Sequence, residues 1–170
     1  MSEGEILPGD YIAGFVDGEG CFALKFCREI KYNRPGKPEY FYWDIEFAIE
    51  LRKDDLAILE QIKAALGCGK ISVGKAGTTR YSVNALGDLM SKVTPFFEKY
   101  TLRVKKRYDF DLWKEALTIF SRNQQKTTVR ASRGFPKINW DKQDEQRLKR
   151  IYLEMKNYKS KGKPWKWLET

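Results

Sequence analysis

The sequence predicts an α+β fold in which a helix, two strands, a helix, two strands and several helices follow one another. Residues 21–29 and 40–51 alternate apolar and polar side chains with the period of a half-buried strand. Residues 53–67 instead repeat apolar side chains at helical spacing. Strands with one apolar face form an antiparallel sheet that is covered on one side only. We expect one domain over residues 1–170, with a basic C-terminal extension at 122–170.

The first elements are a helix, a strand, a loop and a second strand. The stretch YIAGFVDGEGC, residues 11–21, is a short apolar helix that runs into two acidic residues set among glycines. The apolar face of the strand after it carries Phe22, Leu24 and Phe26. A polar stretch with two prolines, residues 30–40, predicts a turn or loop. The apolar side chains at alternate positions of the second strand are Phe41, Trp43, Ile45, Phe47, Ile49 and Leu51.

The remaining elements are a helix, a hairpin and further helices. Asp54 is the candidate N-cap of the helix over 53–67, and Gly67 ends this helix. Residues 70–86 predict a second hairpin whose turn is the stretch GKAGTT. Helical patterns return at 87–100, 103–121 and 141–158. One face of the last helix carries Leu148, Ile151, Tyr152 and Met155.

The charge of the chain indicates a polyanionic partner. The formal net charge is +9, and residues 101–170 hold 19 Lys and Arg against 8 Asp and Glu, whereas residues 1–100 hold 13 against 15. Aromatic side chains interleave with this basic part, which favours nucleic acid over a membrane surface. A structural RNA-binding protein also fits this composition. The sequence shows neither a membrane-spanning run nor a secretory signal, so we expect an intracellular protein, in the cytoplasm of a prokaryote or in an organelle.

The residue types present exclude several chemistries. The chain has no histidine, which excludes imidazole bases, Ser-His and Cys-His triads and histidine zinc sites. The three cysteines form no C-x-x-C pair and fit reduced thiols in a core better than a disulfide framework or a zinc site. Catalysis by this chain therefore has to use carboxylates, lysine, arginine, tyrosine or a metal bound through oxygen.

The end of the opening helix carries an unexpected negative charge. Glu19 adds a carboxylate where unpaired carbonyls already make the helix end negative, which costs ~0.3–1 kcal/mol. Gly14 and Gly18 leave one flank of the helix without side chains, which lets a second helix approach closely. If that helix comes from a second copy, a two-fold axis brings both Glu19 carboxylates together, and Mg²⁺ is the cation expected to neutralise them. The alternative is a glycine-rich turn with two solvated acids.

The residues YIAGFVDGEGCF resemble the LAGLIDADG motif of the homing endonucleases encoded in introns and inteins. Two further segments, FAIELRKDDLAILEQIKAALGCGKIS and VTPFFEKYTLRVKKRYDFDLWKEALTIF, also resemble this family, so the resemblance covers roughly residues 8–121. It implies a saddle of antiparallel strands, with helices over the apolar face and the concave polar face in the major groove of double-stranded DNA. The single copy of the motif implies a homodimer that cuts both strands of a nearly palindromic target with Mg²⁺.

The resemblance also implies roles for individual residues. Glu19 matches the metal-binding acid of the motif, and the carbonyl of Gly18 matches its backbone metal contact. Lys105 falls where the family has a basic residue near the scissile phosphate, with Lys106 as the close alternative. Asp17 matches the other acidic position, for which we expect a structural role. The positions assigned to the dimer interface are Ala13, Gly14 and Asp17.

The chain departs from some single-motif relatives after the second strand. Leu51 and Asp55 stand where those relatives have glutamine and a basic residue, so these two supporting roles are not carried over. Arg52 or Lys53 would substitute only along a different backbone path. A surface charge at a strand-to-helix turn is the simpler interpretation of both residues.

DNA contacts follow from the strand alternation combined with this fold. The side chains expected to face the groove are Lys25, Tyr42, Asp44, Glu46, Lys70, Ser72, Arg80 and Ser82. Lysine and arginine read guanine, and the two acids can accept hydrogen bonds from cytosine N4. The loop residues expected to contact phosphates, together with the C-terminal basic run, are Lys31, Asn33, Arg34 and Lys75. A solvated surface is the alternative for each of these residues.

Two rival functions use the same surface. An RNA maturase of the same family would bind intron RNA and assist splicing without cutting DNA, and a DNA-binding regulator would lack catalysis altogether. The acid at Glu19 favours the nuclease, because a module that only binds has no need of a strained metal site.

Overall fold

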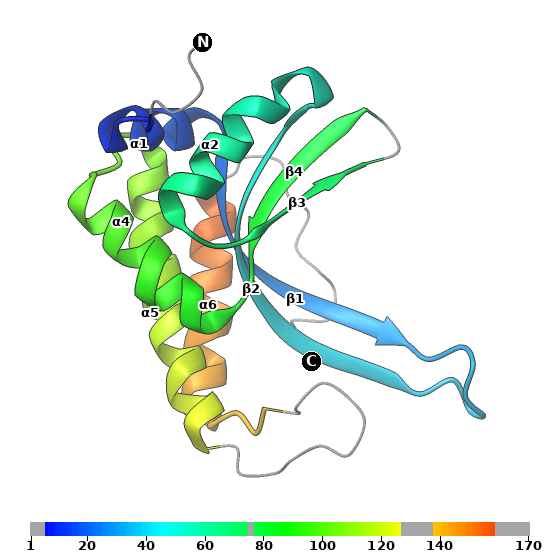
Figure 1. The fold of residues 1–170 in the computed structure, drawn as a ribbon. Coiled ribbons are helices and arrows are strands. Elements are labelled where there is room, and N and C mark those ends of the chain that lie inside the picture. Colours follow the sequence, from blue (N-terminus) through cyan, green and yellow to red (C-terminus); the bar gives the residue numbers. More distant parts are fainter. Residues whose placement is uncertain (1–5, 75–76, 127–137, 159–170) are drawn as a thin grey trace.

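The computed structural model describes residues 6–74, 77–126 and 138–158, and over these residues the α+β architecture is confirmed. The helices lie on one side of a four-stranded antiparallel sheet with the strand order β1-β2-β4-β3 (Figure 1). The first half of the chain forms α1 (Gly9–Glu19), β1 (Gly20–Ile30), β2 (Glu39–Arg52), the 3₁₀ turn η1 (Lys53–Asp55), α2 (Leu56–Leu66), β3 (Lys70–Val73) and β4 (Thr78–Val83). The second half forms α3 (Leu86–Asp88), the π-helical turn η2 (Leu89–Val93), α4 (Thr94–Lys99), α5 (Lys105–Lys126) and α6 (Lys142–Tyr158).

The sheet consists of a long hairpin and a short hairpin that diverge from a common centre. β1 pairs with β2 over the whole of its length, whereas β4 pairs only with Phe47–Arg52 of β2. From Glu39 to Glu46, β2 therefore has a partner strand on one edge only. Figure 1 shows this β1–β2 arm projecting away from the helices, with the β3–β4 hairpin diverging from it. The space between the two hairpins lies on the side opposite the helices.

An aromatic cluster forms the core between the sheet and the helices. The ring centroids of Phe22 and Phe47, on neighbouring strands, lie 5.1 Å apart, and both rings contact Phe97 of α4. Phe110 and Trp113 of α5 also contact Phe22. All five side chains are at most 3% exposed, so they contribute large apolar areas to the stability of the fold. The predicted apolar stripe of α6 is confirmed as well, because all four of its side chains are buried.

Some local predictions are wrong. Asp54 does not cap α2, because it lies inside η1 and its carboxylate accepts a hydrogen bond from Arg52 instead. Phe41 was expected on the covered face but is 47% exposed, because it lies on the arm, where its ring stacks on Phe26 at 5.8 Å. Gly67 does end α2, in the left-handed conformation with φ of 66°, as its position predicted.

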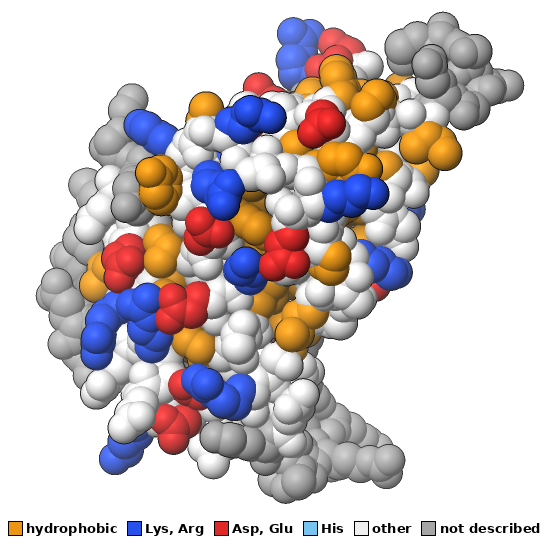
Figure 2. Space-filling view, turned by 90° about the vertical axis from the view of Figure 1, so that its left-hand side faces the viewer, with side chains coloured by type: hydrophobic (Ala, Val, Ile, Leu, Met, Phe, Trp, Pro, Cys, Tyr) orange, Lys and Arg blue, Asp and Glu red, His pale blue; other side chains and the backbone are white. Residues whose placement is uncertain are grey.

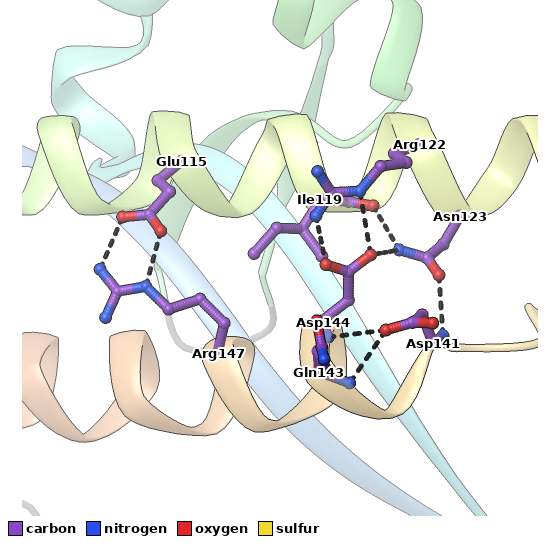
Figure 3. Close-up of polar contacts among 8 residues, drawn as sticks. All are labelled: Glu115, Ile119, Arg122, Asn123, Asp141, Gln143, Asp144 and Arg147. Carbon is purple, nitrogen blue, oxygen red and sulfur yellow. Dashed lines mark hydrogen bonds and ion pairs between the residues drawn. The ribbon is translucent and has the colours of Figure 1, made fainter.

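A polar network joins α5 to α6 near the start of α6 (Figure 3). Asn123 of α5 is fully buried; its side-chain amide donates to Asp144 at 2.6 Å and accepts a hydrogen bond from the Asp141 N–H at 2.9 Å. Arg122 forms an ion pair with the same Asp144 carboxylate. Because buried polar groups are costly unless they are paired, this network fixes where α6 lies on α5. Residue 122, the predicted start of a C-terminal extension, therefore lies inside a core helix.

The second polar contact in Figure 3 makes the stability of the α5–α6 pair depend on pH. Arg147 donates two hydrogen bonds, of 2.6 and 2.7 Å, to the carboxylate of Glu115. These bonds hold the pKa of Glu115 below its usual value. Their contribution is therefore fully present above the usual pKa of a glutamate and is lost as the pH falls through the lowered pKa.

We expect Glu115→Gln to lower the free energy of unfolding by less than about 1 kcal/mol at neutral pH, because both partners are partly exposed. Urea unfolding of the variant and the wild type at a series of pH values measures this difference. The difference should shrink as the pH falls. A difference that stays constant into acid would show that the ion pair does not contribute.

No helix of the described residues is long and apolar enough to cross a membrane. The three cysteines are free thiols, Cys68 buried and Cys21 and Cys27 half-buried. Burial raises the pKa of both Cys27 and Cys68, which keeps these thiols protonated at neutral pH.

Candidate functional site

The junction between α1 and β1 places the acid of the motif at the protein surface. The N–H of Gly20 bonds the carbonyl of Val16, and β1 begins at once. A Cβ atom on Gly20 would lie 2.5 Å from Cγ1 of Val16, so only glycine allows the chain to turn this closely. Glu19, the last residue of α1, is exposed as a result. The carboxylate therefore lies at the C-terminal end of the helix dipole.

One flank of α1 is bare. Gly14 and Gly18 are exposed, and among the described residues a Cβ atom added to either glycine would meet no heavy atom from outside its own stretch of helix backbone within 4 Å. Tyr11 and Phe15 lie on the same flank, since 11, 14, 15 and 18 follow helical spacing, and their rings stack at 6.4 Å. The predicted interface positions did not include these two aromatic residues, although their helical spacing from Gly14 and Gly18 identifies them. The flank is a smooth strip edged by two aromatic rings.

Ala13 does not belong to this flank. It is 3% exposed and packs in the hydrophobic core together with Ile12 and Val16. Small size at this position therefore serves the packing of α1 on its own sheet, and the methyl group faces away from the surface that carries Gly14. The assignment of Ala13 to a dimer interface is not supported by this orientation.

Asp17 links the end of α1 to the start of α5. Its carboxylate accepts hydrogen bonds from the backbone N–H groups of Arg103, at 2.8 Å, and Val104, at 3.4 Å. A negative charge beside the first residues of a helix is also favoured by the helix dipole. Asp17 thus has an internal role, and it brings Lys105, the first residue of α5, to the end of the molecule that carries Glu19.

We expect Asp17→Ala to lower the free energy of unfolding by about 1 kcal/mol, because two backbone donors lose their acceptor. Thermal or urea unfolding of the variant measures this loss. Glu60→Ala is the control for the loss of an acid, since Glu60 is exposed in the middle of α2, where the helix dipole contributes little. Equal stability of Asp17→Ala and the wild type would contradict the role of these two bonds.

The two candidate lysines at the start of α5 differ in exposure. Lys105 is exposed, whereas Lys106 is half-buried. Lys105 is therefore the more accessible of the two lysines. Arg103 and Arg107 lie beside it in the sequence and are also exposed, which makes this end of α5 basic.

The donors at this end suit a hard cation but are too few in one chain. Among the residues that the structure describes, no group of three Cys, Asp or Glu side chains converges as a metal site. The last carbonyls of a helix have no partner within the helix, so the end of α1 offers oxygen ligands beside Glu19. Mg²⁺ takes oxygen ligands and retains several waters. One carboxylate and one carbonyl from each of two copies would fit such an ion.

A chain of ion pairs crosses the polar face of the sheet. Lys25 of β1 pairs with Glu46 of β2, and Arg80 of β4 contacts Glu46 at 2.5 Å and Glu50 at 3.0 Å. Burial opposes the charge of Arg80, but its hydrogen bonds to the two glutamates raise its pKa. The predicted groove-facing residues Lys25, Glu46 and Arg80 are thus brought together.

The other predicted DNA contacts differ in accessibility. Ser82 lies on the polar face, opposite Ala48 and Lys70 on the neighbouring strands, but it is only 6% exposed and offers little surface to a ligand. Asp44 is half-buried. Partial burial raises the pKa of the Tyr42 phenol, so this hydroxyl stays protonated at neutral pH and can donate a hydrogen bond. The exposed residues of the predicted set are Tyr42, Lys70, Ser72, Asn33 and Arg34. Lys31 is paired with Glu29, and Lys75 lies outside the described residues.

The described residues on the helical side of the molecule carry charges of both signs (Figure 2). In Figure 2 the lysine and arginine side chains on this side are interspersed with aspartate and glutamate, and hydrophobic side chains lie among them. A surface of mixed sign attracts a polyanion less than a surface of one sign. The candidate functional site is made up of the polar face of the sheet, where the predicted groove-facing residues lie, and the exposed ends of α1 and α5.

Solved structures of homing endonucleases share this fold of an antiparallel sheet backed by helices. The crystal structure of the homing endonuclease I-TnaI matches with a TM-score of 0.68 at 24% identity, over 92% of this chain and 96% of that chain. I-SmaMI, bound to uncleaved DNA target in the presence of calcium ions, matches with a TM-score of 0.69 at 20% identity, over 91% of this chain and 47% of that chain. Residues 12–117 match the LAGLIDADG endonuclease family, and the chain belongs to this family.

The chain also has a sequence relative that is described as an intron-encoded endonuclease. The chain is 31% identical over 101 residues to a probable intron-encoded DNA endonuclease 1 from Mycosarcoma maydis. The match covers 59% of this chain and 34% of that protein, so the chain spans about a third of the relative's length.

Proposed function

We propose that this protein is a site-specific homing endonuclease that makes a double-strand break in a long, nearly palindromic DNA target by metal-dependent phosphodiester hydrolysis. The observation that carries the proposal is the exposed carboxylate of Glu19 at the end of a helix whose glycine flank is not covered by any other segment of the described residues. Membership of the LAGLIDADG endonuclease family supports it. The intron-encoded relative suggests that this protein too is encoded in an intron and acts inside a cell or organelle.

The proposed active form is a homodimer that is formed through α1. Two copies related by a two-fold axis would place Gly14 of one copy against Gly14 of the other, with Tyr11 and Phe15 covering the edges of the contact. Glycines at this spacing let helix backbones approach closely. The same axis would bring the two Glu19 carboxylates together, which one copy alone does not achieve.

Mg²⁺ is the proposed cofactor, held by the Glu19 carboxylate and the Gly18 carbonyl of each copy. When bound, it supplies charge neutralisation for phosphodiester hydrolysis. The calcium ions present with the DNA-bound I-SmaMI support a divalent cation on this fold. Lys105 would bind the scissile phosphate through its ammonium group, and Asp17 would hold the start of α5 so that this lysine points to the same end as Glu19.

The polar face of the sheet is proposed to lie in the major groove of double-stranded DNA. Arg80, Lys25 and Lys70 would donate to base edges there, because lysine and arginine match the acceptors of guanine. Asn33 and Arg34, exposed in the loop between β1 and β2, would contact phosphates, which fixes the position of the protein without reading sequence.

Cleavage of a defined duplex tests this function. The probe is a DNA duplex that spans the rejoined exons on either side of the reading frame, incubated with the full chain in Mg²⁺ or in EDTA. We expect both strands to be cut in Mg²⁺ and neither strand to be cut in EDTA. Tight binding of the intron RNA without any cleavage of the duplex would instead support a maturase and would overturn the proposal.

A further inference from the structure

We infer that Glu46 is a positioning residue that sets the DNA sequence specificity by holding Lys25 and Arg80 in one orientation. The inference rests on the proposed function, since it assumes that the polar face of the sheet reads DNA. It replaces the expectation that Glu46 reads cytosine directly. The three residues lie on three strands, β1, β2 and β4, so one carboxylate links most of the reading face.

Burial separates Glu46 from the two cations around it. The side chain of Glu46 is 10% exposed, whereas those of Lys25 and Arg80 are 44% and 36% exposed. A carboxylate that is covered by its own cations is poorly placed to accept a hydrogen bond from a base. The two cations remain accessible to DNA, and they are the groups with donors to offer.

The register of the strands explains how one carboxylate reaches both cations. Arg80 lies directly opposite Glu50, and Glu46 follows on the same face of β2 with only the small residue Ala48 between them. The guanidinium can therefore contact both glutamates. Lys25 lies opposite Asp44 and reaches Glu46 diagonally, which is within the range of a long side chain.

The backbone at Glu46 is fixed from the opposite side of the sheet. Trp113 of α5 is fully buried, and its indole N–H donates to the main-chain carbonyl of Glu46 at 3.1 Å. This bond forms next to Phe47, the point where the pairing with β4 ends. The hydrogen bond from α5 thus fixes the backbone of β2, and this backbone in turn fixes the position of the Glu46 side chain. Side chains that are held by rigid elements in this way lose less conformational freedom when a ligand binds.

The charges of the cluster largely cancel. Lys25 and Arg80 carry two positive charges, and Glu46 and Glu50 carry two negative charges. Specific hydrogen bonds to bases need the oriented cations, whereas non-specific binding to phosphates depends on net charge. Removing the Glu46 charge would leave Lys25 without this ion pair, Arg80 held by Glu50 alone, and one more uncompensated positive charge. Specificity and affinity should therefore change in opposite directions.

The experiment compares Glu46→Gln with the wild type on duplexes that the wild type has selected from a randomised DNA library. We expect the affinity of the variant for random duplex to rise, with the slope of log K against log salt steeper by about one. The ratio of specific to non-specific affinity should fall by roughly tenfold, and the loss should fall on the base positions that depend on Lys25 and Arg80. Lys25→Met and Arg80→Met identify those positions.

Two controls separate positioning from a general effect of charge or folding. Glu39→Gln removes an exposed carboxylate that pairs with Arg28 on the outer arm, and it should leave discrimination at those positions unchanged. Glu46→Asp keeps the charge and should restore part of the discrimination. Thermal unfolding of each variant checks that the compared proteins are folded.

The outcomes also separate this inference from the proposed function. If the wild type selects no sequence from the library, the assignment to DNA recognition itself fails. If the wild type selects a sequence and folded Glu46→Gln discriminates as well as the wild type does, only the role of Glu46 is overturned. If Glu46→Gln unfolds, Glu46→Asp takes its place in the experiment. Its discrimination between specific and random duplex must then be lower than that of the wild type at the base positions that depend on Lys25 and on Arg80.

Discussion

Replacing Glu19 by glutamine is expected to lower the rate of double-strand cleavage by more than about 100-fold while leaving the affinity for DNA nearly unchanged. Changes in the outer shell of a metal site typically cost ~10–100-fold, and the loss of a direct ligand should exceed that range. Glutamine has the same shape but no charge, and Glu19 is exposed at the end of α1, so the fold should be preserved. Single-turnover cleavage and binding in Ca²⁺ measure the two effects separately.

Glu60→Gln is the matched control for the loss of one exposed carboxylate. Glu60 is exposed in α2, which is not part of the candidate functional site, and this variant should cleave as the wild type does. If Glu19→Gln cleaved as fast as the wild type, Glu19 would not be a catalytic residue. Equal loss of binding and cleavage would show that Glu19 supports DNA binding instead.

The elements of this fold were predictable because their signals are local. Alternation along β2 assigned Trp43, Ile45 and Phe47 to one face, and the structure buries all three. Gly67 ended α2 because the left-handed conformation suits glycine. Even the failure at Phe41 has a simple cause: alternation predicts the face on which a side chain lies but not whether a helix extends far enough to cover it.

The links between elements were not predictable, because they join residues that are far apart in the sequence. Asp17 and Arg103 are 86 positions apart, and their hydrogen bond exists only because α5 starts beside the end of α1. Trp113 and the carbonyl of Glu46 are 67 positions apart. The pattern of β2 placed Glu46 on the polar face correctly, but its burial depends on Arg80 from another hairpin.

In the candidate site too, some features were predictable from the sequence and others were not. The motif located Glu19, Gly14 and Gly18 on one short helix, and the structure leaves all three exposed. It did not show that Ala13 turns into the core. Sequence adjacency places Ala13 and Gly14 side by side, yet neighbouring helical positions point in directions about 100° apart, so only one of them lies on the free flank.

Gly14→Leu is expected to convert the proposed dimer into a monomer and to abolish cleavage while leaving the chain folded. A Cβ atom at this position meets no other segment within 4 Å in the part of the chain that the structure describes, so the leucine is accommodated in the monomer. Helix propensity even favours leucine over glycine by up to ~1 kcal/mol in a helix interior. In a dimer, two leucine side chains would keep the helix backbones apart and separate the two Glu19 carboxylates. Analytical ultracentrifugation and thermal unfolding measure the two effects.

Gly87→Leu is the matched control, because Gly87 is also exposed, lies in a short helix and has no heavy atom within 4 Å of an added Cβ. This variant should remain a dimer. A stable, dimeric and active Gly14→Leu would place the interface elsewhere, whereas a monomeric wild type on target DNA would exclude the homodimer itself. A Gly14→Leu variant that is monomeric and more stable than the wild type would support the interface on α1. Glycine at this position would then lower the stability of the single chain, and its benefit would be the close approach of a second copy.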